Sequence, residues 1–167
     1  MFRTLKFVPG FIWALIPSLL SWIFFCIPYW LRGVLGSVKT FESVEVQEDL
    51  SIIWDINNKS PFFEKMKGWY GFTAGCNIVV VDVPKKDFCT LKKYLDHETG
   101  HVYQNYLFGI FFYPAYILIT CYLWLFRKDK HAYLDNWFER QARAFAKQEV
   151  DIPKERWPEG SDRWPWW

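Results

Sequence analysis

Two apolar segments without a charged residue dominate the pattern of the chain. The first runs from Gly10 to Leu31 and the second from Tyr106 to Phe126, just before a basic turn. A helix of about 20 apolar residues rises about 30 Å, enough to cross the core of a bilayer. No small residues suited to signal cleavage follow the first segment. We therefore interpret residues 1–36 as an uncleaved membrane anchor, with a buried core helix as the alternative.

Shorter patterns between the two segments predict strands. Residues 41–46 alternate between apolar and polar positions, as a half-buried strand does, and residues 50–56 are a second candidate. The clearest candidate is 72–83, in which we expect Gly75 to mark a bulge or a close approach of another backbone.

Two helices are predicted on either side of the second apolar segment. One begins near Phe88, and residues 131–150 predict the other. Short strands followed by helices indicate an α+β fold. We expect one module over residues 37–150, which includes segment 106–126, and then a Pro- and Trp-rich tail over 151–167.

The composition narrows the classes of function. The net charge is only +2 and no basic run has interleaved aromatic residues, which argues against a nucleic-acid partner. Aromatic residues make up 22% of the chain, and 11 residues are Trp, which collects at membrane interfaces. The four cysteines form no C-x-x-C pair, so neither a disulfide framework nor a thiolate zinc site is expected. Membrane lipid is the partner that this composition favours.

Residues 97–101, His-Glu-Thr-Gly-His, form the most informative motif of the chain. On a helix, residues four apart lie on one face, so His97 and His101 can bind one metal ion together. Glu98 can then reach a water on that ion and act as the general base. This is the HExxH arrangement of zinc hydrolases, whose sites have three protein ligands and one open position. The motif predicts one Zn²⁺ per chain.

The motif does not fix the third ligand. The acidic and histidine candidates that follow it are Asp129, His131, Asp135, Glu139 and Glu149. Glu139 is preferred, because Ala142 and Ala146 follow on roughly its helix face and would let this helix pack closely on the HExxH helix. His131 and Asp135 are the alternative ligands. In that case Glu139 would be a solvated residue paired with Arg143, four residues on.

Three motifs resemble those of the gluzincin-type zinc metallopeptidases, and more narrowly those of short uncharacterised bacterial proteins. They are H-E-x-G-H-x-x-Q at 97–104, an aromatic apolar stretch at 107–114, and W-x-E-x-x-A at 137–142. The likeness covers roughly residues 72–146, and the first 40 residues carry none of it. The apolar stretch is longer and more aromatic here than in a soluble member of this class.

The resemblance implies specific roles for residues of this chain. It implies that His97, His101 and Glu139 are the zinc ligands and that Glu98 is catalytic. It also implies a minimal zincin-like module with a strand before the active helix, along which the substrate backbone pairs; 72–83 is in that place. The chain would be bacterial or phage-encoded.

We therefore expect a membrane-associated zinc-dependent peptidase that hydrolyses a peptide bond of a peptide or protein substrate with a metal-activated water. Tyr133, His131 and Tyr103 are the candidate donors to the oxyanion. One alternative is a non-catalytic membrane interaction protein with a structural or vestigial metal site. Another is a small membrane protein without metal, in which His97 and His101 lie on a helix surface.

The metal site and the second apolar segment constrain each other. If 106–126 crossed the bilayer as one straight helix, His101 and Glu139 would lie on opposite sides, about 30 Å apart. The basic turn would then have to return through lipid, which is very costly. We therefore expect the segment to fold back at Gly109 and Pro114, or to lie in the interface or the core. Labelling that placed Asn105 and Arg127 on opposite sides of a membrane would contradict Glu139 as a ligand.

Overall fold

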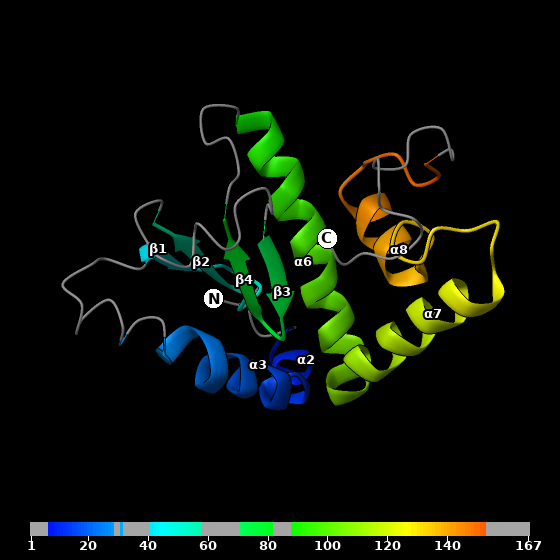
Figure 1. The fold of residues 1–167 in the computed structure, drawn as a ribbon. Coiled ribbons are helices and arrows are strands. Elements are labelled where there is room, and N and C mark those ends of the chain that lie inside the picture. Colours follow the sequence, from blue (N-terminus) through cyan, green and yellow to red (C-terminus); the bar gives the residue numbers. More distant parts are fainter. Residues whose placement is uncertain (1–6, 29–30, 32–40, 58–70, 82–87, 153–167) are drawn as a thin grey trace.

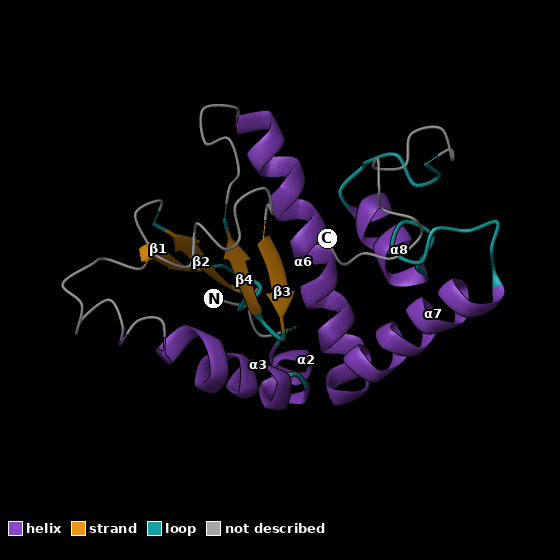
Figure 2. Ribbon diagram, viewed as in Figure 1, coloured by secondary structure: helices purple, strands orange, loops and turns teal. Residues whose placement is uncertain are grey.

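A mixed sheet and a helical layer lie on opposite sides of one long helix (Figure 1). The structure is a computed structural model that describes residues 7–28, 31, 41–57, 71–81 and 88–152. The α+β fold is therefore confirmed within these residues (Figure 2). Most of the Pro- and Trp-rich tail, from residue 153 on, lies outside the described residues.

Within the described residues, the sheet has four strands in the order β1-β2-β4-β3. They are β1 (Phe41–Val46), β2 (Ile52–Ile56), β3 (Gly71–Ala74) and β4 (Asn77–Val80). β1 and β2 are antiparallel, β2 and β4 are parallel, and β3 and β4 form an antiparallel hairpin. The two strands expected near 41–46 and 50–56 are confirmed, and β3 is left as the edge strand beside the long helix (Figure 1).

The single strand expected over 72–83 is wrong, because the chain reverses at Gly75 and Cys76. Gly75 has φ +65°, and a Cβ at this position would lie 2.7 Å from the Cα of Ser18. Ser18 also accepts a hydrogen bond at its Oγ from the Cys76 N–H, at 2.9 Å. The close approach expected at Gly75 is thus present, but it accompanies a turn rather than a bulge in one strand.

The side chains of β4 join two apolar clusters on the two faces of the sheet. Val79 packs with Phe41 and Ile56 on one face. Ile78 packs with Val102 of α6 (Phe88–Phe108) on the other. A strand that is buried on both faces reads as a continuous apolar run, which is why its boundary with β3 was hidden in the sequence.

The first apolar segment is not one straight helix. It forms α2 (Val8–Trp13), α3 (Leu15–Ser21) and the π-helical turn η1 (Trp22–Cys26), with a break at Ala14. α2 packs against α6, and α3 packs against the β3–β4 hairpin. The hairpin residue Asn77 donates to the Ser18 carbonyl at 3.3 Å and accepts from the indole of Trp22 at 2.6 Å.

The second apolar segment folds back, as the metal hypothesis required. α6 ends at Phe108, and the short 3-10 turn η2 (Gly109–Phe111) leads into α7 (Phe112–Phe126) at a sharp angle (Figure 1). Gly109 has φ +55°, and Pro114 lies in the first turn of α7, where proline is tolerated. By length and composition alone, the stretch Leu91–Phe126 is long and apolar enough to cross a membrane.

The helix expected over 131–150 is shorter and forms α8 (Trp137–Phe145). Asn136 caps it, accepting a hydrogen bond at its side-chain oxygen from the Phe138 N–H at 2.9 Å. Before the cap, residues 131–135 form a turn in which Asp135 accepts from the His131 N–H. α8 packs against α6, on the side away from the sheet (Figure 2).

Gly109→Ala should destabilise the fold. A Cβ at Gly109 would lie 2.6 Å from the indole of Trp13, and an alanine would also be held at positive φ. We expect the free energy of unfolding to fall by about 2–4 kcal/mol, from left-handed strain and overpacking together. Thermal unfolding in a mild detergent measures the loss. Gln141→Ala on the exposed face of α8 is the control. Equal thermal stability of the two variants would contradict the claim that the bend at Gly109 requires glycine.

Candidate metal centre

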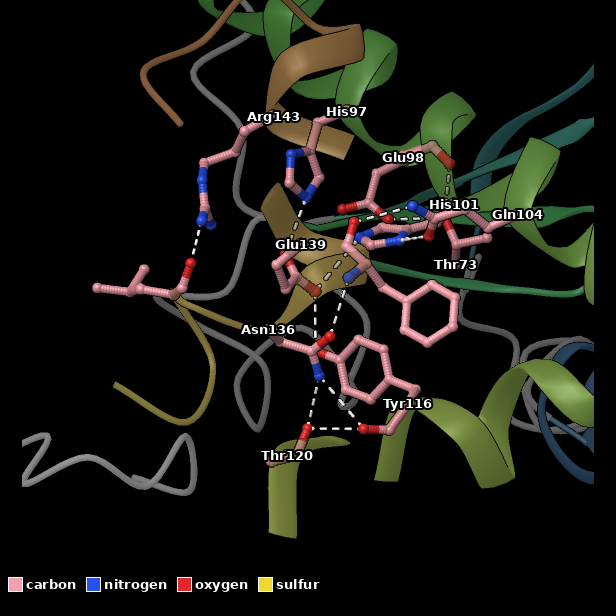
Figure 3. Close-up of polar contacts among 12 residues, drawn as sticks. Thr73, His97, Glu98, His101, Gln104, Tyr116, Thr120, Asn136, Glu139 and Arg143 are labelled. Carbon is pink, nitrogen blue, oxygen red and sulfur yellow. Dashed lines mark hydrogen bonds and ion pairs between the residues drawn. The ribbon is translucent and has the colours of Figure 1, made fainter. Parts of the chain in front are cut away.

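Two packed helices bring the predicted ligands together. His97, Glu98 and His101 lie on α6, and Glu139 lies in the first turn of α8. The helices approach closely because Gly100 faces Ala142: a Cβ at Gly100 would lie 3.1 Å from the Cα of Ala142. The close packing that the small residues of α8 predicted is therefore present, and Figure 3 shows His97 and His101 directed at the Glu139 carboxylate.

The three side chains have the spacing of ligands around one small cation. The Nε2 atom of His97 lies 3.3 Å from Oε2 of Glu139, and the Nε2 atom of His101 lies 3.3 Å from Oε1. Two atoms bound to the same tetrahedral zinc at about 2.0–2.1 Å lie about 3.3 Å apart. One ligand atom from each residue falls within 4.8 Å of the others, so His97, His101 and Glu139 could hold one metal ion.

Burial makes a cation at this point chemically reasonable. His97, His101 and Glu139 are 8%, 7% and 3% exposed, and a buried carboxylate is costly unless it is paired. Within the described part of the chain, Glu139 Oε2 accepts no hydrogen bond, although the His97 ring lies at ion-pair distance. The hydrogen bonds of the Arg143 guanidinium go to the carbonyls of Leu134 and Val150 rather than to the Glu139 carboxylate. The donor set therefore fits a divalent metal.

Without a metal, a proton takes the place of the cation. Burial lowers the pKa of His101, but the neighbouring Glu139 carboxylate outweighs this effect and raises that pKa to about 9. Burial likewise raises the pKa of Glu139, but the positive charge of His101, and then that of His97, holds it well below its usual range. A metal that binds here must displace the His101 proton, because the ligand form of an imidazole is neutral.

Gln104 orients His101. Its Oε1 lies 2.8 Å from His101 Nδ1, and its Nε2 donates to the Phe138 carbonyl of α8 at 2.8 Å. The amide oxygen can only accept, so His101 donates from Nδ1 and leaves Nε2 free for a metal. The sequence placed Gln104 in the motif, but only the structure shows that it links the two helices.

Tyr116 of α7 orients Glu139, a role that the sequence did not reveal. Its hydroxyl donates to Glu139 Oε1 at 2.8 Å. Asn136, the cap of α8, holds the same part of α7 by donating to the Tyr116 carbonyl at 3.2 Å and to the Thr120 hydroxyl at 2.8 Å (Figure 3). The spacing of Tyr116 and Thr120, four residues apart on one helix face, was the only available signal.

The Glu98 carboxylate contacts the edge strand β3. Its Oε2 accepts a hydrogen bond from the Thr73 hydroxyl of β3 at 2.6 Å, and its carbonyl lies 3.1 Å from the same hydroxyl. Glu98 is 6% exposed. A carboxylate on the metal-binding helix is thus fixed in one orientation by a strand of the sheet, and sequence reasoning missed Thr73.

The other candidate residues have different surroundings. Tyr133 lies near the site: burial raises its pKa well above its ordinary value, and the carboxylates of Glu139 and Glu98 raise it further. His131 is fully buried, and its Nδ1 accepts from the backbone N–H groups of Tyr133 and Leu134. Tyr103 instead stacks on Phe7 at a ring distance of 5.6 Å.

Asp135 is not brought into the metal group. Its Oδ2 accepts from the His131 N–H at 2.8 Å, and its Oδ1 lies 3.7 Å from the Lys130 ammonium. Among the described residues, the metal group comprises His97, His101 and Glu139. The preference for Glu139 over Asp135 and His131 therefore agrees with the geometry.

Tyr116→Phe should weaken metal binding without removing a ligand. Loss of a hydrogen bond that orients a ligand typically reduces metal affinity by about 10- to 100-fold, and we expect the Kd for Zn²⁺ to rise within that range. Titration with a competing chelator measures the change. Tyr122→Phe is the matched control, since Tyr122 lies on the same helix and is 53% exposed. An unchanged Kd in Tyr116→Phe would contradict the orienting role.

Comparisons of the chain with known protein families, with curated proteins and with solved structures found no match in any of the three.

Proposed function

We propose that the protein is a membrane-associated zinc-dependent peptidase with a minimal zincin-like module. The observation that carries the proposal is the buried His97–His101–Glu139 group with the Glu98 carboxylate beside it on the same helix. A two-histidine, one-carboxylate set is a known catalytic zinc set, and Glu98 has the position of the general base in the HExxH arrangement. The resemblance to gluzincin-type peptidases supports the same assignment.

The residues of the chain supply the proton transfers of peptide hydrolysis. His97, His101 and Glu139 would hold the zinc ion, which would lower the pKa of a water molecule and polarise a carbonyl group. Glu98 accepts a proton from the water as its oxygen attacks the carbonyl carbon, and passes that proton to the amine nitrogen as the C–N bond breaks. The products are a carboxylic acid and an amine. Thr73 orients Glu98, and Tyr133 is our candidate donor to the oxyanion.

The edge of β3 is our candidate for substrate pairing. Within the described residues β3 is an outer strand of the sheet, hydrogen-bonded to β4, and the Thr73 side chain contacts the catalytic helix. An exposed strand edge offers backbone N–H and C=O groups to an extended peptide. The Tyr113 hydroxyl donates to the Thr73 carbonyl at 3.3 Å, so a substrate that uses this carbonyl must displace it.

The alternative is a non-catalytic interaction protein with a structural metal. The observation that favours it is the burial of all three ligands, because a structural zinc site has no open coordination position. The Glu98 carboxylate beside the ligands favours catalysis instead, since a structural site has no use for a fourth, separately oriented acidic group.

Metal analysis and hydrolysis of a peptide library separate these functions. The purified protein should contain about one zinc per chain, and His97→Ala should lose it. Glu98→Gln should keep the zinc but lose hydrolysis by about 100-fold or more, because it removes the general base. Asp96→Asn is the matched control: Asp96 precedes the motif on the same helix and pairs with Lys92 at 2.9 Å.

Two results would decide against the peptidase. Hydrolysis that Glu98→Gln leaves unchanged would refute the role of Glu98. Bound zinc without hydrolysis in the native protein would favour the structural site.

Thr73→Val should slow hydrolysis with zinc content unchanged. The substitution keeps the shape of the side chain but removes the donor that holds Glu98 Oε2. We expect kcat to fall by about 10-fold, a moderate part of the 10²- to 10⁴-fold that a general base contributes. Thr99→Val, next to Glu98 on α6, is the control. A native kcat in Thr73→Val would show that Glu98 needs no orientation from β3.

A further inference from the structure

The two apolar segments expose their large side chains on neighbouring elements. On α3 and η1 the exposed residues include Ile16, Leu19, Leu20, Ile23 and Phe24. On η2 and α7 they include Ile110, Phe111, Ile117, Leu118, Leu125 and Phe126. Several are more than half exposed, Phe24 at 76% and Leu118 at 69%. We call these two groups together the apolar base.

The two parts of the apolar base meet at η2, from which α7 continues. α3 contacts η2, and an apolar hollow of about 480 Å³ joins them, lined by Pro17, Leu20, Phe24, Ile110 and Pro114 among others. Figure 1 shows α3, α2 and the α6–α7 bend along one edge of the molecule, with the sheet and α8 on the other side. Soluble monomers rarely expose a contiguous apolar patch of this kind.

The chemistry of the apolar base favours lipid as its occupant. Neither Gly10–Leu31 nor Tyr106–Phe126 contains a charged residue, whereas an interface with a soluble protein has a polar rim and hydrogen-bonding groups. Trp13 and Trp124 are 50% and 43% exposed, and tryptophan collects at the boundary between lipid and water. The basic turn of residues 127–130 follows directly at the end of α7, as at the surface of a membrane.

Within the described residues, each helix of the apolar base is shorter than a bilayer core. α7 has 15 residues and rises about 22 Å, and the helical residues 15–28 rise about 21 Å, against about 30 Å for a bilayer core. The longer stretch Leu91–Phe126 is interrupted by the bend at Gly109. Its first half carries Lys92, Lys93 and Asp96, whose burial in lipid would be very costly.

We propose that α3, η1, η2 and α7 form one lipid-docking face, which holds the protein in a single leaflet without crossing the bilayer. The first half of α6, together with α8, then lies on the aqueous side of that leaflet. The proposal adds the mode of attachment to the proposed function. It does not depend on the metal, since no ligand is part of the docking face.

Topology is tested by labelling single cysteines with a membrane-impermeant maleimide in expressing cells and in vesicles. The single cysteines replace Lys92 on α6, Lys128 after α7 and Gln141 on α8. Lys92 is used on α6 in place of Asn105, because Asn105 is fully buried. These positions should all label from the same side, and Leu118 should label only after detergent is added. Labelling of Lys92 and Lys128 from opposite sides would overturn the proposal in favour of a crossing.

The docking face is tested by flotation with vesicles of phosphatidylcholine and phosphatidylglycerol at high salt, where apolar contacts dominate. Replacing both Ile117 and Leu118 with Asp should reduce the bound fraction at least 10-fold. Val46→Asp is the matched control, since Val46 is 68% exposed on β1, away from the docking face. If the native protein and the variant with Asp at positions 117 and 118 bind the vesicles equally, the proposal is overturned.

Two further measurements separate the remaining outcomes. If a second copy of the chain covers this face, light scattering without lipid will show a dimer that the Asp replacements dissociate, and the native protein will not float. That result would also overturn the proposal. His97→Ala should float like the native protein, so failure of metal binding and failure of docking are distinguishable.

Discussion

The close contact between α6 and α8 is the interaction on which the rest of the structure depends. Glu139 can lie between His97 and His101 only if the chain returns to α6 after the apolar segment. The bend at Gly109 makes that return possible, and the Gly100–Ala142 contact lets the two helices approach far enough for a carboxylate to reach both rings. A larger residue at position 100 would push against Ala142 and so increase the distance between the two helices that carry these side chains.

Each element around the site fixes one of its groups. α7 orients Glu139 through Tyr116, and β3 orients Glu98 through Thr73. Gln104 ties His101 to the backbone of α8. These contacts matter because a buried carboxylate and two imidazoles lose their hydration and must find fixed partners instead. The metal group is therefore a property of the whole fold, although its ligands come from two helices.

The sequence was informative where periodicity and chemistry coincide. The helix of residues 97–101 and the strands near 41–46 and 50–56 follow from spacing, and the structure confirms them. Spacing left Asp135 and His131 open beside Glu139, and the structure brings Glu139 together with His97 and His101 in a group that could hold a metal ion. The conflict between a metal site and a straight crossing also led us to expect a fold-back at Gly109 and Pro114; the chain bends at Gly109, whereas Pro114 lies within α7. The metal motif and the apolar segment together constrained the path of the chain more than either of them did separately, because a straight crossing would keep Glu139 away from the two histidines.

What the sequence could not supply depends on contacts between distant residues. The turn at Gly75 is stabilised by Ser18, 57 positions earlier, and the glycine alone does not distinguish a turn between two strands from a bulge within one strand. Thr73 and Tyr116 likewise acquire their roles only when a strand and a helix pack around α6. Position 131 shows the same effect, because a histidine after a basic turn is buried by the cap region that follows it.

The two faces of α7 connect the site to the proposed docking face. Tyr116 and Thr120, one helical turn apart, face α8, where Tyr116 holds Glu139 and Thr120 holds Asn136. Ile117 and Leu118, on the next positions of the helix, are exposed at 58% and 69%. A helix that lies in the interface with its apolar side in lipid must keep its polar side toward water or protein. In this chain that polar side faces the His97–His101–Glu139 group, so the same helix that would rest in lipid also holds the Glu139 carboxylate in place.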